Sequence, residues 1–297
     1  MAAAWTHLVR FIAEEDAQIH FGTLTPPNTL TWDCCRQPDK WFCFFRNSHR
    51  EVMHIKQVSH YHSSFICFLM ALLGKLLSPL AASDVPIIRC MGLNYRDHAK
   101  EANMAIPNDP VLFIKPRTAI AGPFPGKIAV PKFAQDGSSD YEAELSLVIS
   151  KDGRDIKVED ALDYVLGYTC SNDVSARNAQ FLNSQWCFSK GLDGSAPIGP
   201  VLVSPAAIGD AGKLAIKAIH NSNVVQDSNT KEMIFDIATT ISYLSKGTTL
   251  ERGTIIMTGT GPGIGCMRSP KVVLNHGDDM RVEIEKIGTL INEIYYE

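Results

Sequence analysis

The chain has 297 residues, of which 45% are hydrophobic and 20% charged, and its 28 Lys and Arg against 32 Asp and Glu leave a formal net charge of −4. These values are typical of a folded globular protein with a sizeable core and exclude a disordered or collagen-like chain. The mildly acidic balance provides no broad basic surface, so we expect a small-molecule partner, with no nucleic acid and no membrane.

Eight cysteines, none of them in a C-x-x-C pair, are too few for a disulfide scaffold. The residues from Met1 to Asp16 lack the long apolar stretch of a secretory signal and carry three acidic side chains. We therefore expect a reducing compartment, with the cytoplasm as the default and the mitochondrion as the alternative.

The N-terminal third is predicted to be a small β unit over residues 1–85. The apolar runs between Thr6 and Leu24 predict a β-hairpin that opens it. Residues 28–77 are atypical, because they hold four of the eight cysteines and four of the nine histidines, and no glycine occurs between Gly22 and Gly74. The apolar run 65–73 in this segment is too short to span a membrane and predicts a buried helix.

Residues 86–297 form the second predicted domain, where short β-rich segments are separated by Gly, Pro and Asp. The predicted strands are 111–115, 127–130, 142–149, 165–169, 213–220, 254–258, 280–285 and 288–295. The predicted helices are 95–103, 158–164, 178–183 and 236–245. This pattern favours a β-dominated α+β class with a curved or barrel-like sheet rather than a repeated βαβ arrangement.

Two glutamates alternate along the predicted strand 142–149. Glu142 and Glu144 are two residues apart, so their carboxylates point to the same face of a strand. Adjacent like charges are costly unless a cation lies between them, and oxygen ligands favour Mg²⁺, Mn²⁺ or Ca²⁺ over zinc. The alternative is an acidic strand that faces solvent.

A third carboxylate comes from Asp173, which follows the apolar strand 165–169, at a position where functional side chains are often found. It completes a candidate metal triad. Arg177 and Gln180 follow one helical turn apart and could bind a substrate carboxylate. The alternative is that Asp173 is only a helix N-cap and Arg177 only a surface ion pair.

His98 and Glu101 are three residues apart on the predicted helix 95–103, so they share one face. A carboxylate in this position can orient an imidazole for proton transfer or water activation. Such a pair also occurs by chance on exposed helices.

Two glycine-rich segments add further candidates. Lys190 opens the Gly- and Pro-rich segment 190–200, where an ammonium could stabilise an oxyanion. The run 258–265 follows a predicted strand but departs from the dinucleotide fingerprint G-x-G-x-x-G, since Ile264 stands where the third glycine should be. Its backbone amides and Thr260 could instead bind a substrate carboxylate. The histidines and cysteines of the atypical segment have spacings that fit no standard zinc site.

Six ordered blocks of the sequence resemble the fumarylacetoacetate hydrolase family, in the C-terminal catalytic domain shared by acylpyruvate hydrolases, oxaloacetate decarboxylases and tautomerases, and hydroxymuconate-type isomerases. The resemblance runs from about Ile88 to the C-terminus. The blocks are 92–101 (GLNYRDHAKE), 140–144 (DYEAE), 172–177 (NDVSAR), Lys190-Gly with 197–200 (PIGP), 258–260 (TGT) and 282–288 (VEIEKIG). Directly after the fifth block, Gly261 occupies a position where the family usually has proline.

The resemblance implies a mixed β-roll fold, usually a homodimer, and a Mg²⁺ or Mn²⁺ ion held by Glu142, Glu144 and Asp173. It also implies roles for the remaining candidates. His98 and Glu101 would be the acid–base pair on a helix that orders over the substrate, Lys190 would stabilise an oxyanion, and Arg177, Gln180 and Thr260 would contact the substrate.

We therefore expect a metal-dependent hydrolase that cleaves a C–C bond in acylpyruvate-type 2,4-dioxo acids. The first alternative is an oxaloacetate keto–enol tautomerase or decarboxylase, because residues 224–230 and the Gln185-Trp186 pair look similar to that branch. An alternative of another class is a non-catalytic or impaired family member, since the atypical segment 28–77 could be an insertion or a gene-model artefact.

Overall fold

The computed structural model describes residues 5–12, 19–24, 44–46, 52–54 and 75–297. Its largest element is a sheet of ten strands with the order β2-β1-β15-β13-β11-β19-β6-β7, while β5 pairs with β1 and β8 with β15. The strands are β1 (His7–Ile12), β2 (Ile19–Leu24), β5 (Lys75–Leu77), β6 (Ile88–Gly92), β7 (Val111–Lys115), β8 (Ile120–Ala121), β11 (Ala143–Ile149), β13 (Val165–Asn172), β15 (Ala196–Val203) and β19 (Ile255–Thr260). The sheet is mixed, because β19 runs parallel to β6 whereas β11 runs antiparallel to both of its neighbours.

A second mixed sheet has the order β17-β16-β20-β21-β9. Its strands are β9 (Lys127–Val130), β16 (Ala215–His220), β17 (Asn223–Asn229), β20 (Asp279–Ile284) and β21 (Gly288–Tyr296). Three short pairs complete the strands, formed by β3 (Phe44–Arg46) with β4 (Val52–His54), β10 (Ser139–Asp140) with β14 (Ser175–Ala176), and β12 (Gly153–Arg154) with β18 (Thr249–Leu250).

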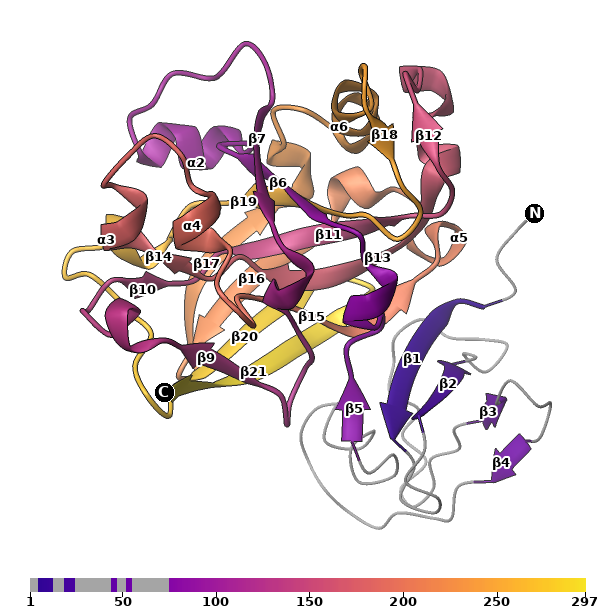
Figure 1. The fold of residues 1–297 in the computed structure, drawn as a ribbon, viewed down its shortest axis with the longest axis horizontal. Coiled ribbons are helices and arrows are strands. Elements are labelled where there is room, and N and C mark those ends of the chain that lie inside the picture. Colours follow the sequence, from indigo (N-terminus) through magenta and orange to yellow (C-terminus); the bar gives the residue numbers. More distant parts are fainter. Residues whose placement is uncertain (1–4, 13–18, 25–43, 47–51, 55–74) are drawn as a thin grey trace.

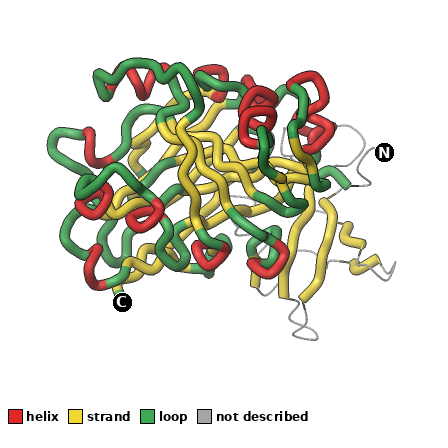
Figure 2. Tube along the Cα trace, turned by 45° about the horizontal axis from the view of Figure 1, so that its top comes forward, coloured by secondary structure: helices red, strands yellow, loops and turns green. Residues whose placement is uncertain are grey.

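Helices and loops surround the strands (Figure 2). The α-helices are α2 (Arg96–Glu101), α3 (Arg177–Gln180), α4 (Cys187–Lys190), α5 (Pro205–Ile208) and α6 (Ile237–Leu244). The 3₁₀ turns are η1 (Ala82–Asp84), η2 (Arg117–Ala119), η3 (Lys132–Ala134), η4 (Val158–Tyr164), η5 (Ala211–Lys213), η6 (Thr230–Glu232) and η7 (Gly265–Met267). Helices α2, α3 and α4 gather at one end of the large sheet, far from the N-terminal hairpin (Figure 1). Within the described residues, no helix has the length and apolar character needed to cross a membrane.

The two sheets share an apolar core. Strand β11 is buried along its whole length, which is why its sequence reads as an almost continuous apolar run. The core includes Leu145, Leu147 and Ile149 from β11 and Ile216, Val282 and Leu290 from the second sheet. Burial of each such side chain contributes about 1.5–3 kcal/mol. This core provides a rigid base for the polar residues at the ends of β11 and β13.

The β-dominated α+β class is confirmed, with two mixed open sheets rather than a closed barrel. The expected N-terminal hairpin is present, and β1 also pairs with β15, so this hairpin extends the large sheet. The division at residue 85 stays a prediction, and the predicted helix 65–73 lies outside the described residues.

Some elements differ from expectation. Residues 158–164 form a 3₁₀ turn and not an α-helix. Strand β15 includes part of the Gly- and Pro-rich segment 190–200, although Pro197, Gly199 and Pro200 are poor strand residues. Its position between β13 and β1, with an irregular register, overrides that local preference.

Candidate active site

Three acidic side chains meet where β11 and β13 lie side by side. The pairing of Ala143 with Asn172 places Glu142 and Glu144 next to Asp173, which directly follows β13. One ligand atom from each of the three carboxylates lies within 4.8 Å of the other two. The residues are 8%, 1% and 0% exposed, respectively, so the alternative of a solvent-facing acidic strand is wrong.

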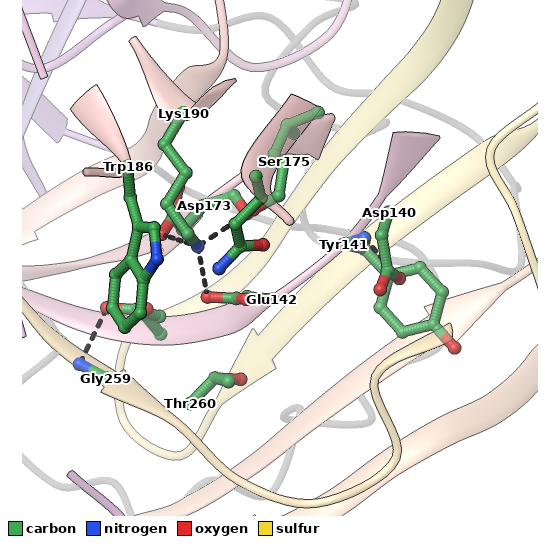
Figure 3. A network of polar contacts seen from close by, with 12 residues as sticks. Asp140, Tyr141, Glu142, Asp173, Ser175, Trp186, Lys190, Gly259 and Thr260 are labelled. Carbon is green, nitrogen blue, oxygen red and sulfur yellow. Dashed lines mark hydrogen bonds and ion pairs between the residues drawn. The ribbon is translucent and has the colours of Figure 1, made fainter. Parts of the chain in front are cut away.

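Glu142 is paired with two cations. Its Oε2 lies 3.0 Å from Nζ of Lys190, and its Oε1 lies 2.7 Å from Nη1 of Arg177. Burial by itself would raise the pKa of Glu142, but Lys190 and Arg177 outweigh burial and lower this pKa to about 2. Figure 3 shows the Lys190 amine between Glu142 and Asp173, whose Oδ2 is 2.6 Å away.

Glu144 lacks the two paired cations that Glu142 has. Its Oε2 accepts a hydrogen bond of 2.7 Å from the Gly259 amide, while Oε1 is buried and has no hydrogen-bond partner among the residues that the structure describes. Burial raises the pKa of Glu144 well above its usual value, and the charges of Asp173 and Glu142 raise it further. A buried carboxylate oxygen without a donor, beside two more carboxylates, fits a hard divalent cation.

Asp173 lies between two lysines. Lys190 contacts Oδ2, and Lys115, at the end of β7, lies with its Nζ 2.7 Å from Oδ1. The alternative role of Asp173 as a helix N-cap is wrong, because the N-cap of α3 is Ala176. Lys115 was not predicted from the sequence, where it appears only as the last residue of a β-rich run.

Arg177 and Gln180 lie on α3 and are 5% and 8% exposed, so Arg177 is not a surface residue. Arg177 donates from Nε to Oδ2 of Asp140 (2.8 Å) and from Nη1 to Oε1 of Gln180 (2.9 Å). Its Nη2 is buried and, within the described part of the chain, has no hydrogen-bond partner. Burial opposes the charge of the guanidinium, but Glu142 and Asp140 raise the pKa of Arg177. The Nη2 amino group, with its two N–H bonds, is thus available for an anion.

His98 and Glu101 face one another on α2 as expected. Nδ1 of His98 lies 3.1 Å from Oε2 of Glu101, and Oε1 of Glu101 accepts a hydrogen bond of 2.9 Å from the Gly263 amide. The start of α2 is fixed by Asn94. Its Oδ1 accepts a hydrogen bond of 2.8 Å from the Phe235 amide, and its Nδ2 donates one of 3.1 Å to the Phe235 carbonyl. The pair is therefore held from both ends of the helix.

The glycine-rich segment 258–265 supports the site through its backbone. The amides of Gly259, Gly263 and Gly265 donate to Glu144, Glu101 and Asp140, respectively, all at 2.7–2.9 Å. These three amides are thus already used by carboxylates of the chain, and the binding of a substrate carboxylate by other groups of this segment stays a prediction.

Thr260 and Lys190 have surroundings that the sequence did not show. The Thr260 hydroxyl donates to the Ala143 carbonyl (2.9 Å) and accepts from Nε2 of Gln226 (2.8 Å). A role for Thr260 in substrate binding stays a prediction. Lys190 ends α4 and does not lie in an open turn. Gln226 and Asp140 were also missed as site residues, since each acts through contacts with segments distant in sequence.

A family model described as "Fumarylacetoacetate (FAA) hydrolase C-terminal" matches residues 87–295. The chain belongs to the fumarylacetoacetate hydrolase family. Caffeoylpyruvate hydrolase of Neonothopanus nambi is 37% identical over 100% of this chain and 96% of its own length, a match that spans the atypical segment. Oxaloacetate tautomerase Fahd2a, mitochondrial, of Rattus norvegicus is 40% identical over 73% of this chain and 68% of its own length.

Among solved structures, the fumarylacetoacetate hydrolase of psychrophilic Exiguobacterium antarcticum is similar with a TM-score of 0.76. It is 29% identical, and the match covers 98% of this chain and 100% of that one. The family is one of enzymes, and the relatives' names describe hydrolase and tautomerase activities on small oxo acids.

Proposed function

We propose that this family member is a metal-dependent hydrolase that cleaves a C–C bond in acylpyruvate-type 2,4-dioxo acids. The observation that carries this proposal is the buried acidic cluster together with the His98–Glu101 pair, whose Nδ1 and Oε2 atoms lie 3.1 Å apart. The glycine-rich segment 258–265 donates hydrogen bonds to both groups. The similarity to a caffeoylpyruvate hydrolase over the whole chain adds to it.

Glu142, Glu144 and Asp173 would hold Mg²⁺ or Mn²⁺, because three carboxylates and no sulfur or imidazole suit a hard cation. When bound, the cation stabilises the negative charge that a 2-oxo acid develops on its carbonyl oxygen. The buried, unpartnered Oε1 of Glu144 supports this assignment.

The protein's own residues divide the remaining tasks. Arg177 would bind the substrate carboxylate through Nη2, with Gln180 beside it and Thr260 as a further contact. Burial opposes the charge of Lys190, but Asp173 and Glu142 raise its pKa, so its ammonium is charged. Its three N–H groups donate to Glu142, Asp173 and Ser175 in this structure, and they would turn to an oxyanion once a cation takes over the two carboxylates.

His98 would activate the attacking water. With Nδ1 directed at Glu101, its Nε2 carries the lone pair that accepts a proton, and Glu101 stabilises the imidazolium that results. The proton can then pass to the carbon atom that leaves with its electron pair.

A second candidate is oxaloacetate tautomerase or decarboxylase activity, which the 40% identity to the rat tautomerase favours. The same acid–base pair would move a proton between carbon and oxygen without an attacking water. Purified protein with Mg²⁺ should release pyruvate from acetylpyruvate, measured by coupling to lactate dehydrogenase. Rapid loss of the enol-oxaloacetate absorbance without pyruvate release would replace the hydrolase by the tautomerase, and no turnover of either compound would favour a non-catalytic family member.

We also infer a homodimer and a cytoplasmic location. Three exposed apolar side chains, Val111, Leu112 and Ile114, lie on β7 at the edge of the large sheet, and Leu182 and Phe188 are exposed nearby on the α3–α4 segment. Sedimentation equilibrium should give twice the chain mass. Because the rat relative is named as mitochondrial, a tagged chain should be localised by microscopy against a mitochondrial marker.

A further inference from the structure

Lys115 is a fully buried lysine that contacts the acidic cluster from outside. Its side chain is 0% exposed, and Nζ donates to the carbonyls of Ser195 (2.8 Å) and Val174 (3.1 Å) and to the Ser195 hydroxyl (3.0 Å). The same atom lies 2.7 Å from Oδ1 of Asp173. A buried charge is costly unless it is paired and hydrogen-bonded, and here the ammonium donates its three protons to the three oxygens of Ser195 and Val174 while the Asp173 carboxylate balances its charge.

The contact separates the two oxygens of Asp173. Lys115 forms its ion pair with Oδ1, which has no hydrogen-bond partner among the described residues, whereas Oδ2 accepts a hydrogen bond of 2.6 Å from Lys190, which also contacts Oε2 of Glu142. The carbonyls that accept from Lys115 belong to Val174 and Ser195, whose backbones are themselves joined by a hydrogen bond of 3.0 Å. Lys115 is thus anchored to rigid backbone on the far side of the carboxylate.

We propose that Lys115 is a positioning residue that fixes the orientation of the Asp173 carboxylate as a metal ligand. This inference rests on the proposed metal site of Glu142, Glu144 and Asp173. Groups that hold a ligand from behind typically change metal affinity by 10–100-fold when they are removed.

The direction in which metal affinity changes on removal of Lys115 distinguishes a positioning role from a purely electrostatic one. Loss of a positive charge beside three carboxylates would by itself strengthen the binding of a divalent cation. Loss of orientation weakens it, because the Asp173 carboxylate must then be ordered when the ion binds. The proposal therefore requires weaker binding after removal of Lys115.

The test measures the Mn²⁺ dissociation constant of Lys115→Met by the electron paramagnetic resonance signal of free Mn²⁺, without any assay of activity. We expect a dissociation constant 10–100-fold above that of the unmodified protein. Lys127→Met is the matched control, since Lys127 is an exposed lysine paired with Glu293 (2.8 Å) on the second sheet, and it should bind Mn²⁺ with unchanged affinity.

Unchanged or tighter Mn²⁺ binding by folded Lys115→Met would overturn the proposal. Should this variant not fold, Lys115→Gln retains an N–H donor for the Ser195 carbonyl and should show the same loss of affinity. Failure of both variants to fold would assign Lys115 to the fold and also overturn it. If the unmodified protein binds no Mn²⁺, the proposed metal site itself is wrong. Equal Mn²⁺ affinity of the unmodified protein and Lys115→Met would instead leave the metal site intact and overturn only the role of Lys115.

Discussion

Replacement of Glu144 by glutamine is expected to stabilise the metal-free protein. Oε1 of Glu144 is buried without a donor, and its charge faces Asp173 and Glu142. A buried polar group without a partner costs about 1–3 kcal/mol, and the neutral amide also removes the like-charge repulsion while its carbonyl can still accept from the Gly259 amide. We expect a gain of about 1–3 kcal/mol in the free energy of unfolding, which raises Tm by roughly 2–6 °C.

Glu142→Gln is the matched control and should have the opposite effect. Both oxygens of Glu142 are paired, and its pKa lies at about 2 against an ordinary value of 4.5. Because the folded pKa is the lower one, this stabilisation is present above pH 4.5 and is lost as the pH falls toward 2. At about 1.4 kcal/mol for each pH unit, the variant should lose roughly 3 kcal/mol at pH 7.

Differential scanning calorimetry in EDTA at pH 7 measures both effects, and titration with Mn²⁺ should show that both variants bind the ion more weakly. The reasoning fails if Glu144→Gln melts below the unmodified protein, or if Glu142→Gln melts at the same temperature as that protein. Acid titration adds a check, since the difference between Glu142→Gln and the unmodified protein should shrink below pH 4.5.

Three further predictions concern catalysis. His98→Ala should lower kcat about 10²–10⁴-fold while the Mn²⁺ dissociation constant stays the same, and normal turnover would remove His98 from the mechanism. Arg177→Lys should raise KM for acetylpyruvate, because lysine cannot reproduce the contacts of a guanidinium with Asp140 and Glu142; a normal KM would contradict the substrate role. Dialysis against EDTA should abolish turnover and added Mg²⁺ or Mn²⁺ should restore it, so full activity after dialysis would exclude the metal requirement.

The residues whose placement follows from local spacing could be predicted from the sequence. Glu142 and Glu144 are set by the two-residue repeat of a strand, and His98 and Glu101 by the turn of a helix. Asp173 followed from its place after a buried strand. In each case the neighbouring residues determine the geometry, so the sequence contains the necessary signal.

The residues that depend on distant segments were not predictable in this way. Lys115 reaches Asp173 across 58 positions of the sequence, and Gln226 joins Ala143 to Thr260 from the second sheet. No local pattern marks either side chain. A buried lysine at the end of an apolar strand is the signal that could have identified Lys115, because burial of its charge requires a partner.

One peptide segment supports both halves of the site. The amides of Gly259 and Gly263 hold the carboxylate of Glu144 in the acidic cluster and the carboxylate of Glu101 in the proposed acid–base pair. A side chain at Gly263 would approach the Val225 carbonyl to 2.1 Å, and one at Gly265 would approach the Val272 carbonyl to 1.8 Å, so neither position has room for another residue. A change in this backbone would displace Glu101 and the acidic cluster together. Substitutions that alter substrate recognition without disturbing the proposed chemistry are therefore expected at side chains outside this segment.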